Sequence, residues 1–422
     1  MVGFSASTRP TRARLGRAEA IAHIMARSFP EDALDLTGLE LEWLVVPGAG
    51  GHPLDLDRTA PEYFPLPGAS AVSIEPGGQI ELSSLPRPDL ASLCRDVALD
   101  TSALGDRVAR SGAQLLGMGL SPGEAGPRRL RTPRYDAMAE FFAADGPAGS
   151  MMMTSTASLQ VNVGLGSPAA RQDRWRRANV LGPVLAAAFA NSPLAAGGPT
   201  GLASTRLAVW SAIDTSRTAA AWRPGRLIES WAPYVLDARV MLIRGDDHDF
   251  AALGHVALPF GRWLTDGHEL GYPTLDDLDY HLTTLFPPVR PKGWLELRFL
   301  DALPAPWWPA AAAVTAALVG HEEAGCRAEL AAGCFHASWR LAFTHGLRHP
   351  GLQRAAEECF AAASAVMTDI GAGTVVTDAL DGYVDRFVAR GRTPADERLD
   401  AFERTGSPLL AEDAHQLVGA AQ

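Results

Sequence analysis

The stretch that decides the fold is Tyr272–Asp301, YPTLDDLDYHLTTLFPPVRPKGWLELRFLD. Its first part has leucines at helical spacing behind Thr274, a residue type favoured at helix N-caps, and two consecutive prolines end this pattern. After a Pro-Lys-Gly turn, Trp294–Asp301 alternates between apolar and polar residues, which predicts a β-strand. Glu296 and Arg298 would share the polar face of that strand.

Three further segments alternate in the same way. A single strand of this kind is typical of a solvated sheet face, on which charges of opposite sign pair. Here carboxylates gather with few cations beside them, and such a group needs cations between its members. Because alternating faces are typical of antiparallel sheets, we expect an α+β fold built on one antiparallel sheet. The polar faces would carry Glu40 and Glu42 in 39–43, Gln79, Glu81 and Ser83 in 79–83, and Ser158, Gln160 and Asn162 in 158–163.

The chain shows no internal repeat and no long linker, so we expect one catalytic domain over residues 17–405. It would be sheet-rich over 36–301 and helical over 302–405, with a flexible N-terminal tail at 1–16 and a C-terminal tail at 406–422. Between the alternating strands, the pattern predicts a Gly/Pro-rich loop at 47–53, a helix over 88–117, strands over 149–163 and 206–213, and a hairpin of 238–244 with 250–257.

Composition excludes several classes of function. The 422 residues carry a net charge of −11, which argues against a nucleic-acid partner because such binding needs a basic face. No apolar run reaches membrane length, so no membrane partner is expected. The four cysteines lack metal-ligand spacing and are expected to be reduced, as in a cytoplasmic protein. Lysine occurs once, at Lys292.

The sequence motifs for phosphate and metal binding are weak. No GxxxxGK[ST] loop is present. Residues 164–169 match GxGxxA, but the preceding strand is half polar, which favours a plain turn and helix cap over a dinucleotide site. His345 and His349 lack the glutamate of HExxH and are interpreted as structural. The Glu, Gln and Asn oxygens of the strands instead suit Mg²⁺, which commonly works with nucleotide phosphates. A sheet face of this kind suggests phosphoryl transfer.

Four segments carry a family resemblance: EPGGQIELSS, MMMTSTASLQVNV, AAFANSPL and HLTTLFPPVRPKGWLELR. In this order they resemble the plant-type glutamate–cysteine ligase family, and most of all its actinobacterial branch of ergothioneine biosynthesis. The resemblance spans about residues 36–399. It implies a curved antiparallel sheet forming a funnel with helices outside, similar to glutamine synthetase, with two or three Mg²⁺ on the concave face. The paired regulatory cysteines of the plant enzymes have no evident match here.

The resemblance also implies site residues. Glu40, Glu42, Glu81, Gln160 and Glu296 match its metal ligands, and Arg134 and Arg206 match the arginines that hold the glutamate substrate. Arg298 matches a contact to the transferred phosphate, which makes Arg298 and Glu296 the expected catalytic residues. We add Arg290 and Lys292 as ATP contacts from their charge and their position beside this strand.

The implied reaction joins the γ-carboxylate of L-glutamate to the amino group of L-cysteine, with ATP as co-substrate and a γ-glutamyl phosphate between the two steps. We expect a monomer. Three alternatives stay open: a ligase for another amine, a non-catalytic metal-binding paralogue, and a metal-dependent hydrolase. Retention of all four carboxylates and Arg298 disfavours the paralogue.

Overall fold

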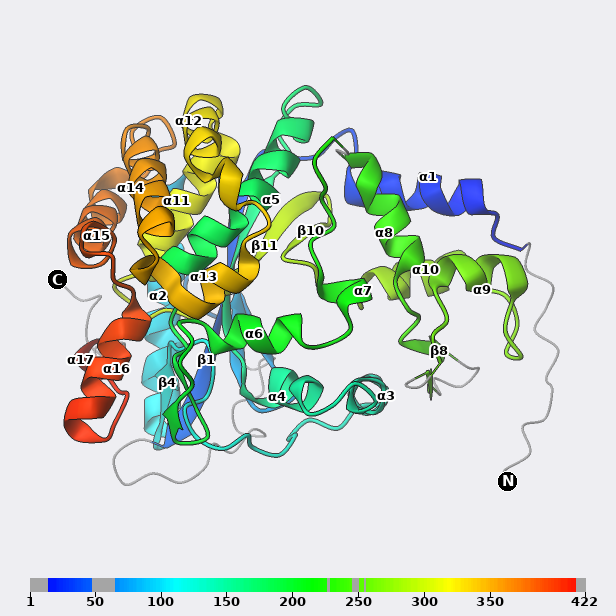
Figure 1. Ribbon diagram of the computed structural model, residues 1–422, viewed down its shortest axis with the longest axis horizontal. Helices are drawn as coiled ribbons and strands as arrows, with labels where there is room; N and C mark the ends of the chain where they lie inside the picture. The colour runs from blue at the N-terminus through cyan, green and yellow to red at the C-terminus, as the bar shows by residue number, and fades with distance from the viewer. Residues whose placement is uncertain (1–13, 48–64, 226–227, 245–249, 254–255, 415–422) are drawn as a thin grey trace.

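The computed structural model describes residues 14–47, 65–225, 228–244, 250–253 and 256–414. It contains a seven-stranded sheet in the order β10-β11-β5-β1-β3-β2, with β4 also paired to β1, and every pairing is antiparallel (Figure 1). The expected α+β class with an antiparallel sheet is confirmed. The strands are β1 (Thr37–Pro47), β2 (Ala71–Ile74), β3 (Ile80–Ser83), β4 (Ala113–Leu116), β5 (Ser158–Gly164), β10 (Val289–Pro291) and β11 (Trp294–Asp301).

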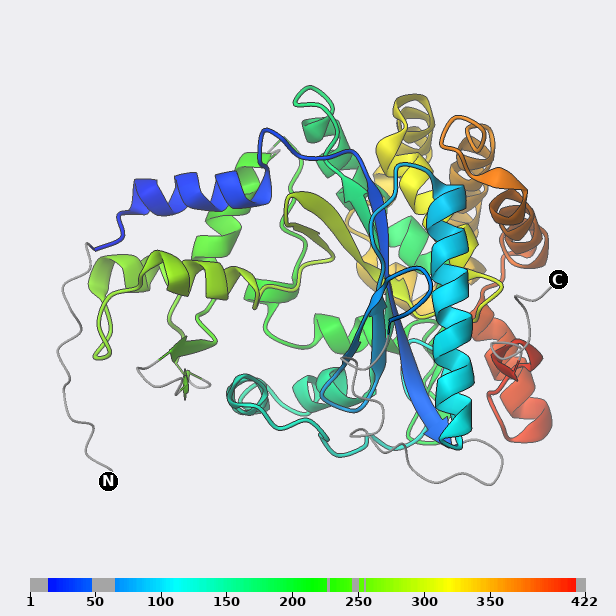
Figure 2. The same ribbon diagram turned by 180° about the vertical axis from the view of Figure 1, so that it is seen from behind.

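One group of helices covers the apolar face of the sheet. A second group lies beyond β10 and β11 and is formed by residues 17–28, 231–237, 260–266 and 275–282 (Figures 1 and 2). The longer ones are α1 (Arg17–Ser28), α2 (Leu90–Arg110), α3 (Pro133–Ala143), α4 (Ala148–Ser155), α5 (Arg171–Ala188), α10 (Leu275–Leu282), α11 (Trp308–Gly320), α12 (Glu322–Ala332), α14 (Pro350–Ser364), α15 (Gly373–Arg386) and α16 (Pro394–Thr405). The shorter ones are α6 (Thr205–Ser211), α7 (Thr215–Thr218), α8 (Trp231–Asp237), α9 (Phe260–Asp266), α13 (Trp339–His345) and α17 (Ala411–Ala414).

The strand pattern read from the sequence explains how the sheet is covered. Leu39, Leu159 and Leu297 are all buried on the apolar side of their strands. That side packs against helices, with α5 on β11 and α11 on β5. Burial of such apolar surface stabilises the fold by about 25 cal/mol per Å². Because the apolar face is held against the helices in this way, the polar face must point to the other side, toward the cavity described below.

The opening stretch folds as predicted. Thr274 caps α10 through a capping box, in which its hydroxyl accepts from Asp277 N at 3.2 Å and Asp277 Oδ2 accepts from Thr274 N at 2.9 Å. The strand prediction for Trp294–Asp301 is confirmed by β11, which pairs with β5 and β10.

One predicted strand is right only in its second half, and another is wrong. Of residues 149–163, residues 158–163 lie in β5 as expected, whereas 149–155 belong to α4, whose buried methionines join an apolar cluster with α3. Residues 206–213 form most of α6 instead, which begins where the Ser204 hydroxyl accepts from Leu207 N at 3.2 Å. The predicted helix over 88–117 ends at Arg110, and the chain then enters β4 on the edge of β1.

The remaining predictions have mixed outcomes. The helical character of 302–405 is confirmed by α11–α16. The predicted hairpin is the pair β8 (Leu242–Arg244) and β9 (Phe250–Ala252), shorter than expected, and a second small pair joins β6 (Leu194–Ala195) to β7 (Gly198–Pro199). The hairpin turn, nearly all of the loop at 47–53, and most of the N-terminal tail lie outside the described residues.

The described residues also show the state of the cysteines and the character of the helices. All four cysteines are free, with Cys94 and Cys359 buried and Cys326 and Cys334 exposed. Within the same ranges, no helix is both long and apolar enough to cross a bilayer.

Candidate active site

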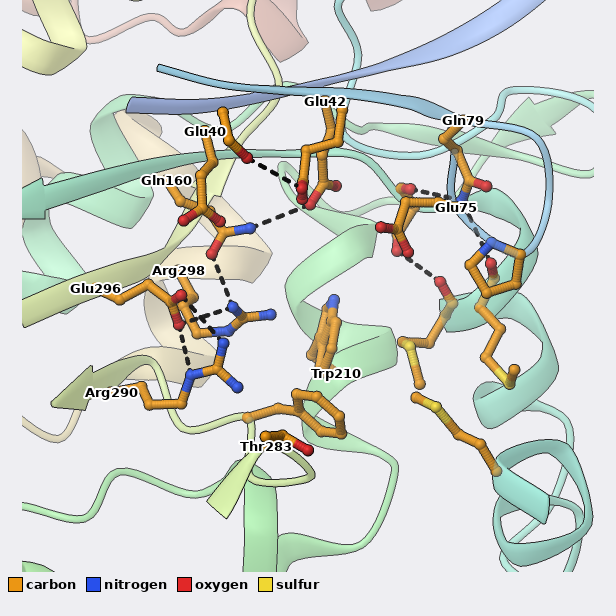
Figure 3. Close-up of a pocket in the computed structure, with 18 of the residues that line it drawn as sticks. Glu40, Glu42, Glu75, Gln79, Gln160, Trp210, Thr283, Arg290, Glu296 and Arg298 are labelled. Carbon is orange, nitrogen blue, oxygen red and sulfur yellow. Dashed lines mark hydrogen bonds and ion pairs between the residues drawn. The ribbon is translucent and has the colours of Figure 1, made fainter. Parts of the chain in front are cut away.

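A cavity of about 390 Å³ opens on the polar face of the sheet (Figure 3). One wall comes from β1, β3, β5 and β11, and the other from α3, α4, α6 and the turn after α10. The structure thus brings together all but one of the site residues predicted from the sequence. The lining residues are Glu40, Glu42, Glu75, Pro76, Gln79, Glu81, Ser83, Arg134, Tyr135, Met138, Met152, Met153, Thr156, Gln160, Trp210, Thr283, Phe286, Arg290, Lys292, Glu296 and Arg298.

The register of the sheet sets which polar side chains are neighbours. Glu42 lies opposite Glu81 across the β1–β3 pair, and Glu40 lies opposite Gln160 across the β1–β5 pair. Side chains directly opposite each other on antiparallel strands are about 5 Å apart at Cβ. Four strands therefore deliver their polar residues to one surface, which the shared alternation predicted.

Glu296 lies at the centre of a cationic cluster at one end of the cavity (Figure 3). Its side chain is 0% exposed. Its carboxylate accepts from Arg290 Nε at 2.6 Å, from Lys292 Nζ at 2.9 Å and from Arg298 Nη1 at 2.9 Å. Burial acts to raise the pKa of Glu296, but the charges of Arg290, Arg298 and Lys292 outweigh it and hold this pKa well below its usual range. Glu296 is therefore ionised and positions three cations.

A hydrogen-bonded chain links this cluster to β1. Arg298 Nη1 donates to Gln160 Oε1 at 2.7 Å, and Gln160 Nε2 donates to Glu42 Oε1 at 3.1 Å (Figure 3). The other oxygen of Glu42 accepts from Ser158 N at 2.7 Å. Gln160 thus holds the guanidinium and the carboxylate at fixed positions on neighbouring strands.

The other carboxylates of the cavity lie near one another, and their pKa values are raised. Burial and the charge of Glu42 raise the pKa of Glu75 to about 7, and burial with Glu42 and Glu75 raises the pKa of Glu81 to about 8. Burial and the charge of Glu296 raise the pKa of Glu40. Burial is the largest cause of each of these pKa shifts, and the charges of neighbouring carboxylates add to it.

The crowded carboxylates suit metal ions by charge and donor type. Carboxylate and amide oxygens are the ligands that Mg²⁺ prefers, and a divalent ion would relieve the repulsion between the carboxylates. In the part of the chain that the structure describes, no three carboxylate, imidazole or thiol groups are already arranged as a metal site. Glu296 differs from the rest of the expected metal set, since both of its oxygens accept hydrogen bonds from cations.

The two arginines expected to hold glutamate occupy different environments. Arg134, at the start of α3, lines the cavity and donates to Thr283 Oγ1 at 3.0 Å and to Thr283 O at 3.2 Å. Arg206 is 3% exposed and is the one predicted site residue that does not line the cavity. It donates to the carbonyl oxygen of Arg298 at 2.8 Å and lies 3.8 Å from Asp301, so it braces β11 from α6.

Several lining residues were not assigned to the site from the sequence. Glu75 lies in the turn between β2 and β3, so no strand alternation marked it. Trp210 was placed on a predicted strand that is in fact α6, and among the described residues its buried Nε1 has no hydrogen-bond partner. Tyr135 and Thr283 are ordinary helix and turn residues in the sequence. Met152 and Met153 were interpreted as packing residues, and they also line the cavity.

The arrangement of sheet and helices is shared with a solved structure. The glutamate–cysteine ligase of Francisella tularensis, in complex with AMP, superimposes with a TM-score of 0.51, covering 90% of this chain and 87% of that chain. At 12% sequence identity this likeness concerns the fold alone. The fold is that of the glutamate–cysteine ligase type, as the sequence predicted.

Sequence comparison identifies the family. The model of glutamate–cysteine ligase family 2 (GCS2) matches residues 36–415, and the chain belongs to this family and is a ligase. It is 39% identical over 349 residues to the glutamate–cysteine ligase EgtA of Mycobacterium tuberculosis, covering 80% of this chain and 78% of the relative. It is 37% identical over 359 residues to EgtA of Mycolicibacterium smegmatis, covering 81% of this chain and 82% of the relative. The chloroplastic glutamate–cysteine ligase of Nicotiana tabacum is 31% identical over 253 residues, covering 57% of this chain and 48% of the relative.

Proposed function

We propose that this protein joins the γ-carboxylate of L-glutamate to the amino group of L-cysteine with ATP, giving γ-glutamylcysteine for ergothioneine biosynthesis. The supporting relatives are the two EgtA ligases, which align over about four-fifths of the chain. The observation that carries the proposal is the cluster of Arg290, Lys292 and Arg298 around the buried Glu296, because it supplies fixed positive charge next to a surface of carboxylates.

The chemistry requires an activated carboxyl group. A carboxylate is a poor electrophile, so the glutamate γ-carboxylate first takes the γ-phosphate of ATP to form γ-glutamyl phosphate, with ADP released. The amine of cysteine then attacks the carbonyl carbon, and the C–O bond to phosphate breaks. Both steps place negative charge on phosphate oxygens, which Arg298, Arg290 and Lys292 are positioned to stabilise.

The glutamate substrate would be held by guanidinium groups. Arg134 lines the cavity with one face of its side chain against Tyr280, at 5.1 Å from the ring centroid. Its planar fork suits a bidentate grip on a carboxylate. Arg206, buried behind β11 with its Nη1 3.8 Å from Asp301, would be the second of these guanidinium groups.

Mg²⁺ would be held by Glu40, Glu42, Glu81, Gln160 and Glu296, with Glu75 beside them. When bound, two or three such ions supply positive charge that offsets the charge of the nucleotide phosphates. Adding Mg²⁺ to protein freed of metal should raise the melting temperature, and the rise should shrink in Glu42→Gln and Glu81→Gln. The absence of any rise in the wild-type protein would contradict the metal assignment.

The test of the reaction is ADP release measured with glutamate and Mg²⁺, with and without cysteine and a panel of other amines. We expect release to require glutamate and to be fastest with cysteine. Glu296→Gln and Arg298→Ala should each lower turnover. The expected rise in the activation free energy is about 2–4 kcal/mol, the scale for losing one electrostatic stabiliser. ADP formation independent of glutamate would exclude this function and favour a hydrolase.

We also infer a monomeric, single-domain enzyme of the cytoplasm. The four cysteines lie in the described part of the chain and are unpaired there, as in a reducing compartment. Light scattering coupled to size-exclusion chromatography tests the oligomeric state, and cell fractionation tests the location.

A further inference from the structure

The cavity has a methionine wall, formed by Met138 of α3 with Met152 and Met153 of α4. These side chains are 7%, 6% and 3% exposed and belong to one apolar cluster with Phe141 and Phe142. In Figure 3 the sulfur atoms lie on the Glu75 side of the cavity, across from Glu296 and Arg290. The methionine wall therefore faces a part of the bound substrates that is distant from the phosphate-stabilising cations.

Two polar side chains next to the methionine wall, those of Gln79 and Thr156, are bonded to the protein. Gln79 Nε2 donates to the carbonyl oxygens of Thr156 at 2.9 Å and Met153 at 3.4 Å, and its Oε1 accepts from Gly77 N at 3.0 Å. The hydroxyl of Thr156 donates to Met152 O at 2.7 Å. The wall thus offers thioether and methyl groups to a ligand and leaves these neighbouring groups engaged with the protein.

The same contacts fix the position of the methionine wall. The turn between β2 and β3 is packed so closely on α4 that a Cβ at Gly77 would lie 2.2 Å from the carbonyl oxygen of Thr154. Real Cβ atoms do not approach backbone that closely, so only glycine fits there. The methionine wall is therefore held against the turn that carries Glu75 and against β3, which carries Glu81. It is a fixed part of the cavity lining.

A surface of this chemistry discriminates between a thiol and a hydroxyl. A thiol is a weak hydrogen-bond donor that behaves as a small apolar group and can be buried against thioethers, whereas a hydroxyl buried there loses its bonds to water. An adenine ring would also fit an apolar surface, but its ring-edge donors and acceptors would find the side chains of Gln79 and Thr156 already engaged with the protein.

We propose that the methionine wall of Met138, Met152 and Met153 binds the side chain of the amine acceptor and selects a thiol over a hydroxyl. This inference rests on the proposed ligase function and adds the residues that determine its specificity. Rejection of an added hydroxyl by an apolar pocket is worth about 100-fold, so L-serine should be used about 100-fold less efficiently than L-cysteine.

The test compares kcat/KM for L-cysteine, L-serine and L-2-aminobutyrate with ATP and glutamate saturating. In Met152→Gln and Met153→Gln, the preference for cysteine over serine should fall at least tenfold, through KM for cysteine, while KM for ATP changes less than twofold. Met153→Leu should keep the preference. Met241→Gln is the matched control, because Met241 is 2% exposed in the same apolar cluster but does not line the cavity.

Three results would overturn the inference. The first is an unchanged preference in folded Gln variants, and the second is a rise in KM for ATP in place of KM for cysteine. The third needs only wild-type protein: it is the use of L-2-aminobutyrate, which carries a methyl group in place of the thiol, no better than that of L-serine. ADP release that never depends on glutamate would instead contradict the ligase function itself.

Discussion

Glu42 and Glu81 face each other directly across the β1–β3 pair, a position at which like charges repel. The pKa of Glu81 is raised to about 8, by burial first and by the charges of Glu42 and Glu75. Glu81 therefore binds a proton more tightly in the folded chain than in the unfolded chain. Its contribution to stability is complete below about pH 4.5 and is lost as the pH rises toward about 8.

The first prediction concerns this pair in metal-free protein. Between pH 5.5 and 8 the wild-type protein should lose stability, by at most about 1.4 kcal/mol per pH unit for one such group, and Glu81→Gln should lose less. Urea unfolding in the presence of EDTA measures this. Mg²⁺ should stabilise the wild-type protein more at pH 8 than at pH 5.5, since the carboxylates are then ionised. Equal pH slopes for wild type and variant would show that Glu81 is not the source.

The second prediction concerns a buried ion pair that ties α17 to α16. Arg398 is 0% exposed and donates to both oxygens of Asp413 at 2.9 and 3.0 Å, and to Asn191 Oδ1 at 2.6 Å. Asp413→Ala leaves the guanidinium buried without its counter-ion and should reduce the free energy of unfolding by about 3–5 kcal/mol.

The neighbouring Glu412 provides the control for that variant. It pairs with Arg386, whose side chain is 37% exposed, at 2.8 Å. Glu412 itself is 18% exposed, but Arg386 keeps a second partner, Glu397, at 2.8 Å. A partly exposed pair of this kind contributes about 1 kcal/mol or less, so Glu412→Ala should be nearly as stable as the wild type. Similar losses for both variants in urea unfolding would mean that the helix α17, and not the ion pair, is what stabilises this end of the chain.

The third prediction concerns His281 in α10, which lies against Phe260 at a ring distance of 4.7 Å and bonds to Val235 O at 3.0 Å. Burial first, and then the charge of Arg217, lower the pKa of His281 to about 3. The unfolded chain binds this proton below about pH 6.5 and the folded chain does not, so acidification from pH 6.5 to 5 should destabilise the protein. His281→Gln should flatten that part of the stability profile relative to wild type. An unchanged slope would mean that other groups account for the acid sensitivity.

The fourth prediction separates the two arginines proposed to bind glutamate. Arg134 lines the cavity near its opening, so Arg134→Ala should raise KM for glutamate at least tenfold with little change in melting temperature. Arg206 is buried beside Asp301 and supports β11, so Arg206→Ala should lower the melting temperature as well. Steady-state kinetics with varied glutamate and a thermal melt distinguish them. An unaltered KM for glutamate in both folded variants would exclude them as the grip on this substrate.

Strand alternation made the polar wall of the site predictable. Glu40, Glu42, Glu81 and Glu296 each lie between apolar residues that must face the helices, so their direction follows from the backbone alone. The sequence cannot show which cations reach them, because Arg290 meets Glu296 only through the β10–β11 register. The pairing of Glu42 with Glu81 depends on register in the same way.

The opposite wall could not be predicted for a different reason. Short apolar runs such as MMMTS and RLAVW fit either a strand or a helix, and tertiary packing decides between them. Here Met152 of α4 and Trp210 of α6 pack against the apolar cluster that includes Phe141 and Phe142 of α3. Their side chains line the cavity as a result. Glu75 belongs to a turn, where side-chain direction follows from the turn and not from any periodic pattern.

The position of Lys292 has a consequence for chemical labelling. It is the one lysine of the sequence, its side chain is 39% exposed, and its ammonium group lies in the cavity beside Glu296. Apart from the α-amino group, every amine-directed reagent therefore has a single target, and that target is in the active site. A nucleotide that protects the protein from such a reagent would report occupancy of the cavity from one modified residue, read by the mass of the intact chain.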